Sequence, residues 1–178
     1  MSTTDVILEL FKYVIPAGLV LAAVTIVLRE MEKRQESRQR YRMRRDALAT
    51  TLPLRLQAYE RAILFLERIS PENLIARCDG NGKTAQVFRQ QLILEIKAEY
   101  EHNLTQQLYI ESASWIEVIK AKEKLIGIIN MATKSIPPQA GGVDLGRKIV
   151  EIIVGHGQMP TREAIEALKE EAHKLFKY

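Results

Sequence analysis

The chain has 178 residues, of which 47% are apolar and 27% charged, and its single cysteine is Cys78. This length accommodates one membrane segment and one modest soluble domain, which excludes a large multidomain enzyme. The apolar content is too high for a disordered chain. One cysteine excludes a disulfide framework and a Cys-cluster zinc site, and it fits a reducing compartment.

The most apolar part of the chain lies within residues 1–28. Tyr13–Leu28 (YVIPAGLVLAAVTIVL) carries no charge, and extending this run back to Val6 adds only Glu9 and Lys12 as charged residues. About 20 helical residues cross a hydrocarbon core of about 30 Å, so we expect a transmembrane helix here. A cleaved signal peptide fits less well, because the start is acidic and no small-residue cleavage pattern follows. A buried core helix is usually shorter.

The excess positive charge of the chain lies in residues 29–45. Their net charge is +5, whereas residues 1–28 carry −1 and residues 46–178 are neutral. Basic residues beside a span mark its cytoplasmic side. We therefore expect a single-pass protein of the inner membrane, with its N-terminus outside and its C-terminal domain cytoplasmic.

The basic residues also bear on the structure of this segment and on what it contacts. Residues 29–50 lack Gly and Pro and are rich in helix-forming residues, which predicts a basic helical stalk. Its basic side chains are expected to contact anionic lipid headgroups. They are Arg29, Lys33, Arg34, Arg38, Arg40, Arg42, Arg44 and Arg45. Few aromatic residues accompany them, and the rest of the chain is neutral, which argues against a nucleic-acid partner.

Residues 51–178 show helical periodicity and no convincing two-residue alternation. Pro53 suits the first turn of a helix. The expected helices are Leu54–Ile69, Asn73–Arg77, Ala85 to about Gln107, one opening at Ser112, one that follows Asp144 and ends at Gly155-His156-Gly157, and one capped by Thr161. The predicted fold is therefore all-α, with a transmembrane helix continuing into the stalk and then a cytoplasmic helical bundle.

Two loop motifs resemble ligand sites but lack required residues. Gly82-Lys83-Thr84 matches the end of a phosphate-binding loop, yet the earlier glycine of that pattern is replaced by Arg77. Asp79 begins a calcium-like loop, but Gln90 stands where the coordinating glutamate is needed. We therefore interpret this segment as a turn that leads into a helix capped by Thr84.

Two Glu-x-x-His motifs raise the alternative of a metal site. Di-iron carboxylate bundles use two such motifs and a glutamate from each of two other helices. The pairs are Glu99/His102 and Glu170/His173, with Glu60 or Glu67 and Glu117 or Glu123 as further ligands. Glu170 points about 140° away from the apolar face of its helix, which argues against this set. Glu95, Glu99 and His102 do share one strip, as metal ligands or as a polar network at the edge of the bundle.

Two cations, Arg55 and Lys122, fall on the apolar sides of their helices. One interpretation lays the aliphatic stem along the core while the charge reaches water. The other pairs Arg55 with a carboxylate such as Glu99, which would fix the register of two helices.

Two stretches carry a resemblance to a known family. They are TLPLRLQAYERAILFLERISPENL (Thr51–Leu74) and EYEHNLTQQLY (Glu99–Tyr109). They resemble an uncharacterised family of single-span membrane proteins common in Bacteroidota, and the likeness covers most of the chain. The resemblance implies a cytoplasmic helical domain on an inner-membrane anchor, and it implies no activity or cofactor. By analogy it marks the polar positions Arg55, Gln57, Tyr59, Glu60, Glu99, His102 and Asn103.

Two functions follow as hypotheses. The first is a non-enzymatic, membrane-tethered scaffold or accessory subunit that docks other inner-membrane proteins or a second copy of itself, without a cofactor. The alternative is a metal-dependent enzyme or sensor that uses Glu95, Glu99 and His102. Nothing in the sequence forms a Ser/His/Asp or Cys/His catalytic set.

Overall fold

The computed structural model describes residues 3–176, and it leaves many side chains between residues 3 and 48 undescribed. The chain divides into two compact units, Met1–Thr50 and Thr51–Tyr178. The helices are α1 (Thr3–Arg68), α2 (Pro71–Cys78), α3 (Ala85–Asn103), the 3₁₀ helix η1 (Leu104–Leu108), α4 (Ser112–Lys134), α5 (Gly142–His156) and α6 (Arg162–Lys174). The described residues form no strand beyond one bridge between Thr84 and Gly141. The predicted all-α class is confirmed.

The predicted transmembrane helix within residues 1–28 is corrected. Among the residues that the structure describes, no helix is long and apolar enough to cross a membrane. The uncharged run Tyr13–Leu28 has sixteen residues, or about 24 Å of helix, and the prediction extended it across Glu9 and Lys12 to match a core of about 30 Å. The location at the inner membrane, with the C-terminal domain cytoplasmic, stays a prediction.

The predicted helix start at Pro53 is also wrong, because α1 continues through this residue without a break. Proline removes one helix hydrogen bond, and its fixed φ is compatible with helical backbone. Residues 44–52 contain no glycine and several good helix formers, so the helix extends past the proline on its N-terminal side.

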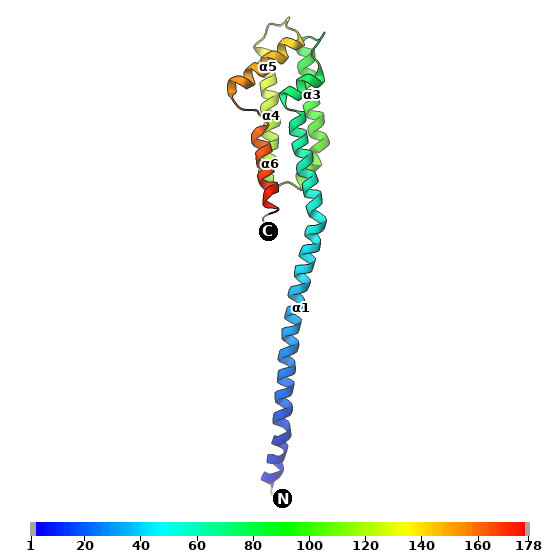
Figure 1. Ribbon diagram of the computed structural model, residues 1–178, viewed down its shortest axis with the longest axis vertical. Coiled ribbons are helices and arrows are strands. Elements are labelled where there is room, and N and C mark those ends of the chain that lie inside the picture. The colour runs from blue at the N-terminus through cyan, green and yellow to red at the C-terminus, as the bar shows by residue number, and fades with distance from the viewer. Residues whose placement is uncertain (1–2, 177–178) are drawn as a thin grey trace. The chain divides into compact units, whose positions relative to one another are not determined.

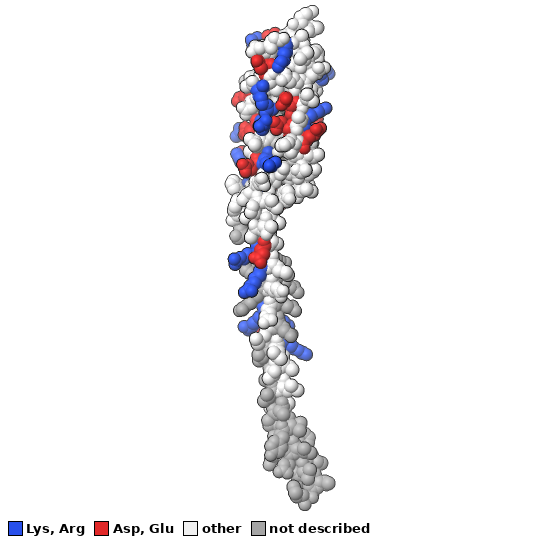
Figure 2. Space-filling view, turned by 90° about the vertical axis from the view of Figure 1, so that its right-hand side faces the viewer, with Lys and Arg blue, Asp and Glu red and all other residues white. Residues whose placement is uncertain are grey.

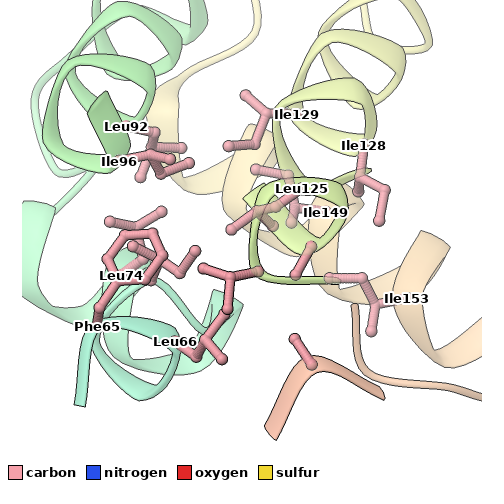
Figure 3. Packing of buried hydrophobic residues seen from close by; sticks show 14 of the residues in the cluster. Phe65, Leu66, Leu74, Leu92, Ile96, Leu125, Ile128, Ile129, Ile149 and Ile153 are labelled. Carbon is pink, nitrogen blue, oxygen red and sulfur yellow. The ribbon is translucent and has the colours of Figure 1, made fainter. Parts of the chain in front are cut away.

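The core of the unit Thr51–Tyr178 is built around α4, which contacts α3, α5 and α6 (Figure 1). Apolar side chains from these helices and from the last turns of α1 meet in one cluster (Figure 3). Among them are Phe65, Leu66, Leu92, Ile96, Leu125, Ile129 and Ile149, each at most 1% exposed. Burial of such side chains contributes about 1.5–3 kcal/mol each, which makes this cluster the main stabilising feature of the unit.

The turn between α2 and α3 is a structural junction, as the sequence predicts. Thr84 accepts a hydrogen bond from the backbone N–H of Val87 at 3.3 Å and so caps α3. The ammonium of Lys83 donates to the carbonyls of Cys78 and Asp79 at 2.7 and 2.6 Å, which satisfies the C-terminal end of α2. The interpretation of Gly82-Lys83-Thr84 as a turn that leads into a helix cap agrees with these contacts.

Close backbone contact fixes the start of α5 against this junction. A Cβ at Gly142 would lie 2.6 Å from the carbonyl oxygen of Gly80, so only glycine fits there. The helix begins at Gly142, two residues before the predicted Asp144, which instead accepts a hydrogen bond from the N–H of Gly141 at 3.1 Å. Asp144 therefore closes the first turn of α5.

Candidate interaction groove between helices α1 and α3

A groove of about 640 Å³ runs between α1 and α3 in the second unit. Helix α1 contributes Gln57, Glu60, Arg61, Leu64, Phe65 and Arg68, and α3 contributes Glu95, Ala98, Glu99, His102 and Asn103. Both sets recur at three- and four-residue spacing, so each helix presents one stripe to the groove. The groove thus collects five of the seven polar positions that the family resemblance marks, together with Glu95 from the predicted metal strip.

One end of the groove is closed by ion pairs, and we call it the paired end. The guanidinium of Arg68 lies 2.6 Å from a carboxylate oxygen of Glu99. Arg77 approaches the same carboxylate at 3.9 Å and Glu95 at 3.6 Å. Asn103 donates its side-chain amide to the carbonyl of Glu99 at 2.8 Å. The ion pairs link α1, α2 and α3, and they occupy the carboxylates that a metal ion would need.

The other end of the groove holds four polar side chains without partners, and we call it the free end. They are Gln57, Glu60, Arg61 and His102, all of them exposed. Within the part of the chain that the structure describes, none of the four forms a hydrogen bond or an ion pair. An amide, a carboxylate, a guanidinium and an imidazole therefore converge there and remain available to a ligand.

The charges on this unit are mixed in sign. Figure 2 shows acidic and basic side chains lying close together on one face of the helical domain, whereas the charged side chains drawn in colour on the preceding segment are mostly basic. A surface of alternating sign does not attract one class of ion over long range. It favours instead a partner that places a charge of opposite sign against each charge of the surface.

A second polar cluster, the Glu171 cluster, joins Arg55, Tyr59 and Glu171. The Tyr59 hydroxyl donates to Oε1 of Glu171 at 2.6 Å, and Arg55 donates to the same oxygen at 3.3 Å and to the Tyr59 hydroxyl at 2.9 Å. The Glu171 side chain is 3% exposed, whereas the Arg55 side chain is 31% exposed. The predicted pairing of Arg55 with Glu99 is wrong, because Glu171 on α6 is the carboxylate that Arg55 reaches.

The Glu171 cluster also completes the start of α4. The backbone N–H of Glu111, the N-cap residue of α4, donates to Glu171 at 2.8 Å. A carboxylate at a helix N-terminus interacts favourably with the unpaired N–H groups and the helix dipole. Glu171 thus links α6 to both α1 and α4. The second oxygen of Glu171 and the indole N–H of Trp115 are buried without a partner among the described residues.

Burial and the neighbouring carboxylate also change the acidity of Tyr59. Desolvation, followed by the hydrogen bond and charge of Glu171, raises the pKa of Tyr59 from 10.0 to about 12, against a smaller opposing effect of Arg55. The hydroxyl is therefore held in its protonated, hydrogen-bond-donating form. This is a structural role, and it leaves Tyr59 poorly suited to act as a base.

The alternative prediction of a metal site gains no support from these contacts. Among the described residues, no group of three or more His, Cys, Asp or Glu side chains lies close enough to hold a metal ion. Glu99 is paired with Arg68, and the second motif, Glu170 and His173, points to solvent on α6. Burial raises the pKa of the Cys78 thiol, which lowers its reactivity.

The contacts of Lys122 agree with the interpretation that its stem lies along the core. Its side chain is 14% exposed, and its ammonium lies 4.1 Å from the centre of the Tyr100 ring and 2.9 Å from Glu123. The charge is thus stabilised by a cation–π contact and by a carboxylate nearer to solvent.

The basic side chains expected to contact lipid are described only in part. Arg29, Lys33, Arg34, Arg42 and Arg45 are exposed. Arg34 pairs with Glu30 at 3.1 Å. The side chains of Arg38, Arg40 and Arg44 lie outside the described residues.

The sequence interpretation missed three residues that matter in the structure. Arg61 and Arg68 line the groove at a seven-residue spacing, and Glu171 anchors the buried cluster. A signal for Glu171 was present, because it lies three residues after Leu168 and next to Ala172, on the apolar side of its helix. A carboxylate on an apolar face favours a cationic partner on the apolar side of another helix, and Arg55 is such a residue.

The described residues form an all-α fold with a polar groove between α1 and α3. By sequence the chain belongs to the family of unknown function DUF7935, whose match covers residues 5–175. This confirms the expected membership of an uncharacterised family. No curated protein and no solved structure matches the chain.

Proposed function

We propose that this protein is a non-enzymatic scaffold or accessory subunit that docks a protein partner in the groove between α1 and α3. The observation that carries the proposal is the free end of the groove. Four polar side chains of different chemistry line one groove here, and none of them has a partner among the described residues. Such a set gives a protein partner several directional contacts within one recess.

The rigidity of the groove supports the same proposal. The paired end fixes the spacing of α1 and α3 through Arg68 and Glu99, and buried Phe65 lies at the base of the groove. A preformed surface of this kind binds without the entropic penalty of ordering its own backbone. The scaffold role needs no chemistry from the residues that line the groove.

The basic segment supports a location of such a scaffold beside a membrane. Its described basic side chains are exposed, which supports contact with an anionic lipid surface of about 1 kcal/mol for each residue near the headgroups. We propose this electrostatic contact as the route by which the protein works beside a membrane. The distribution of the family in Bacteroidota is proposed on the sequence resemblance alone.

Site-specific photo-crosslinking in cells tests the docking role. A photoreactive amino acid replaces Gln57 or His102 in the groove, and the matched control replaces Glu163, an exposed residue of α6. We expect protein adducts from both groove positions and markedly fewer from position 163. Equal yields at all three positions, or no adduct from the groove, would contradict the proposal.

A further inference from the structure

The exposed stripe of α1 carries an ordered charge pattern. Leu64 lies at its centre and is 54% exposed. At about 100° per residue, the other exposed residues of the stripe fall within about 60° of Leu64. They are Gln57, Glu60, Arg61, Glu67 and Arg68.

The charges on this stripe separate into two rows. Around the helix axis, Glu60 and Glu67 lie about 40–60° to one side of Leu64. Arg61 and Arg68 lie about 40–60° to the other side. The members of each row are seven residues apart, and so are Gln57 and Leu64. A seven-residue repeat is the spacing at which two helices keep the same faces in contact.

A two-fold axis parallel to α1 would bring unlike rows together. With such an axis, the acidic row of each copy faces the basic row of the other copy, once on each side of the axis. Leu64 and Gln57 would then each meet their own counterpart on the axis. An antiparallel arrangement would instead face the acidic rows with each other and the basic rows with each other, which is unfavourable.

The charges in question are available for this role. Glu60, Arg61 and Glu67 have no ion pair among the described residues, and Arg68 keeps a 48% exposed side chain beside Glu99. We infer that a second copy of this chain docks on the α1 side of the groove, in parallel alignment, through Glu60–Arg61 and Glu67–Arg68 pairs between copies. This inference rests on the proposed function, because it names the occupant of the same groove.

Charge reversal in the full-length chain tests the pairing between copies. Glu60→Arg and Arg61→Glu each place like charges opposite one another in a homodimer, so each should weaken self-association by about tenfold in sedimentation velocity. An equal mixture of the two variants restores unlike pairs and should recover wild-type association. Glu101→Arg and Lys97→Glu, exposed residues of α3 outside the groove, make the same changes in net charge and should have no effect.

Cysteine crosslinking tests the alignment. Gln57→Cys and Leu64→Cys should each form a disulfide-linked dimer, because only a parallel arrangement brings both positions to their own counterparts. The native Cys78 is 3% exposed and should not crosslink, and Glu163→Cys provides an exposed control on α6. Crosslinking at only one of the two groove positions would overturn the parallel alignment.

The outcomes separate this inference from the proposed function. A monomeric full-length chain, or a mixture of charge variants that associates no better than either alone, overturns the second copy as the occupant. If photoreactive groups at Gln57 and His102 still capture a different protein, the scaffold role stands with another partner. If these groups capture neither a second copy nor another protein, both proposals fail.

Discussion

Helix α1 carries two polar clusters within about three turns of each other, and they differ in how their groups are satisfied. In the Glu171 cluster, one buried oxygen of Glu171 accepts from Tyr59, Arg55 and the backbone of Glu111. At the free end of the groove, four exposed side chains have no partner among the described residues, namely Gln57, Glu60, Arg61 and His102. A carboxylate that is buried and bonded contributes to stability, whereas an exposed and unbonded one contributes little until a ligand arrives.

Substitutions in the two clusters should therefore have opposite effects on folding stability and on docking. Changes in the Glu171 cluster should reduce folding stability and leave the docking surface unaltered in the molecules that remain folded. Changes at the free end should leave stability unaltered and reduce docking.

The largest loss is expected from Glu171→Ala. The substitution leaves the hydroxyl of Tyr59 without its acceptor and removes the carboxylate at the start of α4. It also takes one of three acceptors from Arg55, which still reaches the Tyr59 hydroxyl and the carbonyl of Tyr109. We expect the free energy of unfolding to fall by about 3 kcal/mol, measured by urea denaturation. The matched control is Glu170→Ala, because Glu170 is the adjacent, exposed carboxylate of the same helix, and its effect should stay within about 0.5 kcal/mol. Equal losses in both variants would remove the distinction between the clusters.

A smaller, pH-dependent loss is expected from Tyr59. Because the folded-state pKa of Tyr59 is raised from 10.0 to about 12, folding favours the protonated hydroxyl. This contribution is fully present below pH 10 and is lost as the pH rises through about 12. Tyr59→Phe should lower stability by about 1–2 kcal/mol at neutral pH. The gap between wild type and variant should then narrow between pH 10 and pH 12. A gap that stays constant over this range would mean that Tyr59 does not titrate as the cluster requires.

The sequence predicted the helices more accurately than the contacts between them. The starts of α3 and α4 and the cap positions at Thr84 and Thr161 follow from local signals, namely capping residues and apolar spacing. The continuation of α1 through Pro53 did not follow, because a proline within a helix has the same local signature as one in its first turn. Helix starts that carry a capping residue are set by nearby residues, which one sequence displays directly.

Partner choice between helices could not be predicted in the same way. The sequence places Arg55 on the apolar side of its helix, with its charge either reaching water or paired with a carboxylate such as Glu99. In the structure, Arg55 pairs with Glu171 because tertiary packing brings α6 next to Arg55. Glu99 pairs with Arg68 because the C-terminal end of α1 packs beside α3. The groove was partly anticipated, since its polar positions on α1 and α3 were marked by the family resemblance and by one shared strip.

A modest effect is expected from Glu99→Gln at the paired end. Its partners Arg68 and Arg77 have side chains 48% and 32% exposed, so water replaces much of the lost interaction. We expect a loss of about 0.5–1 kcal/mol in the free energy of unfolding, well below that of Glu171→Ala. Glu101→Gln, an exposed neighbour outside the groove, should show no change. A loss as large as that of Glu171→Ala would show that the paired end, and not the buried cluster, fastens the helices.

The smallest effect on stability is expected from His102→Ala, and it separates binding from folding most cleanly. His102 is exposed in the groove and forms no hydrogen bond among the described residues, so its removal should change the free energy of unfolding by less than about 0.5 kcal/mol. If the free end docks a protein through both helices, the same substitution should weaken capture of that partner by about fivefold, or about 1 kcal/mol. His173→Ala is the matched control, because His173 is also exposed but lies on α6, away from the groove. Both variants should unfold at the temperature of the wild type, and only His102→Ala should dock less tightly. Unchanged docking with His102→Ala would show that the imidazole lies outside the contact, and would move the docking surface toward the α1 side of the groove.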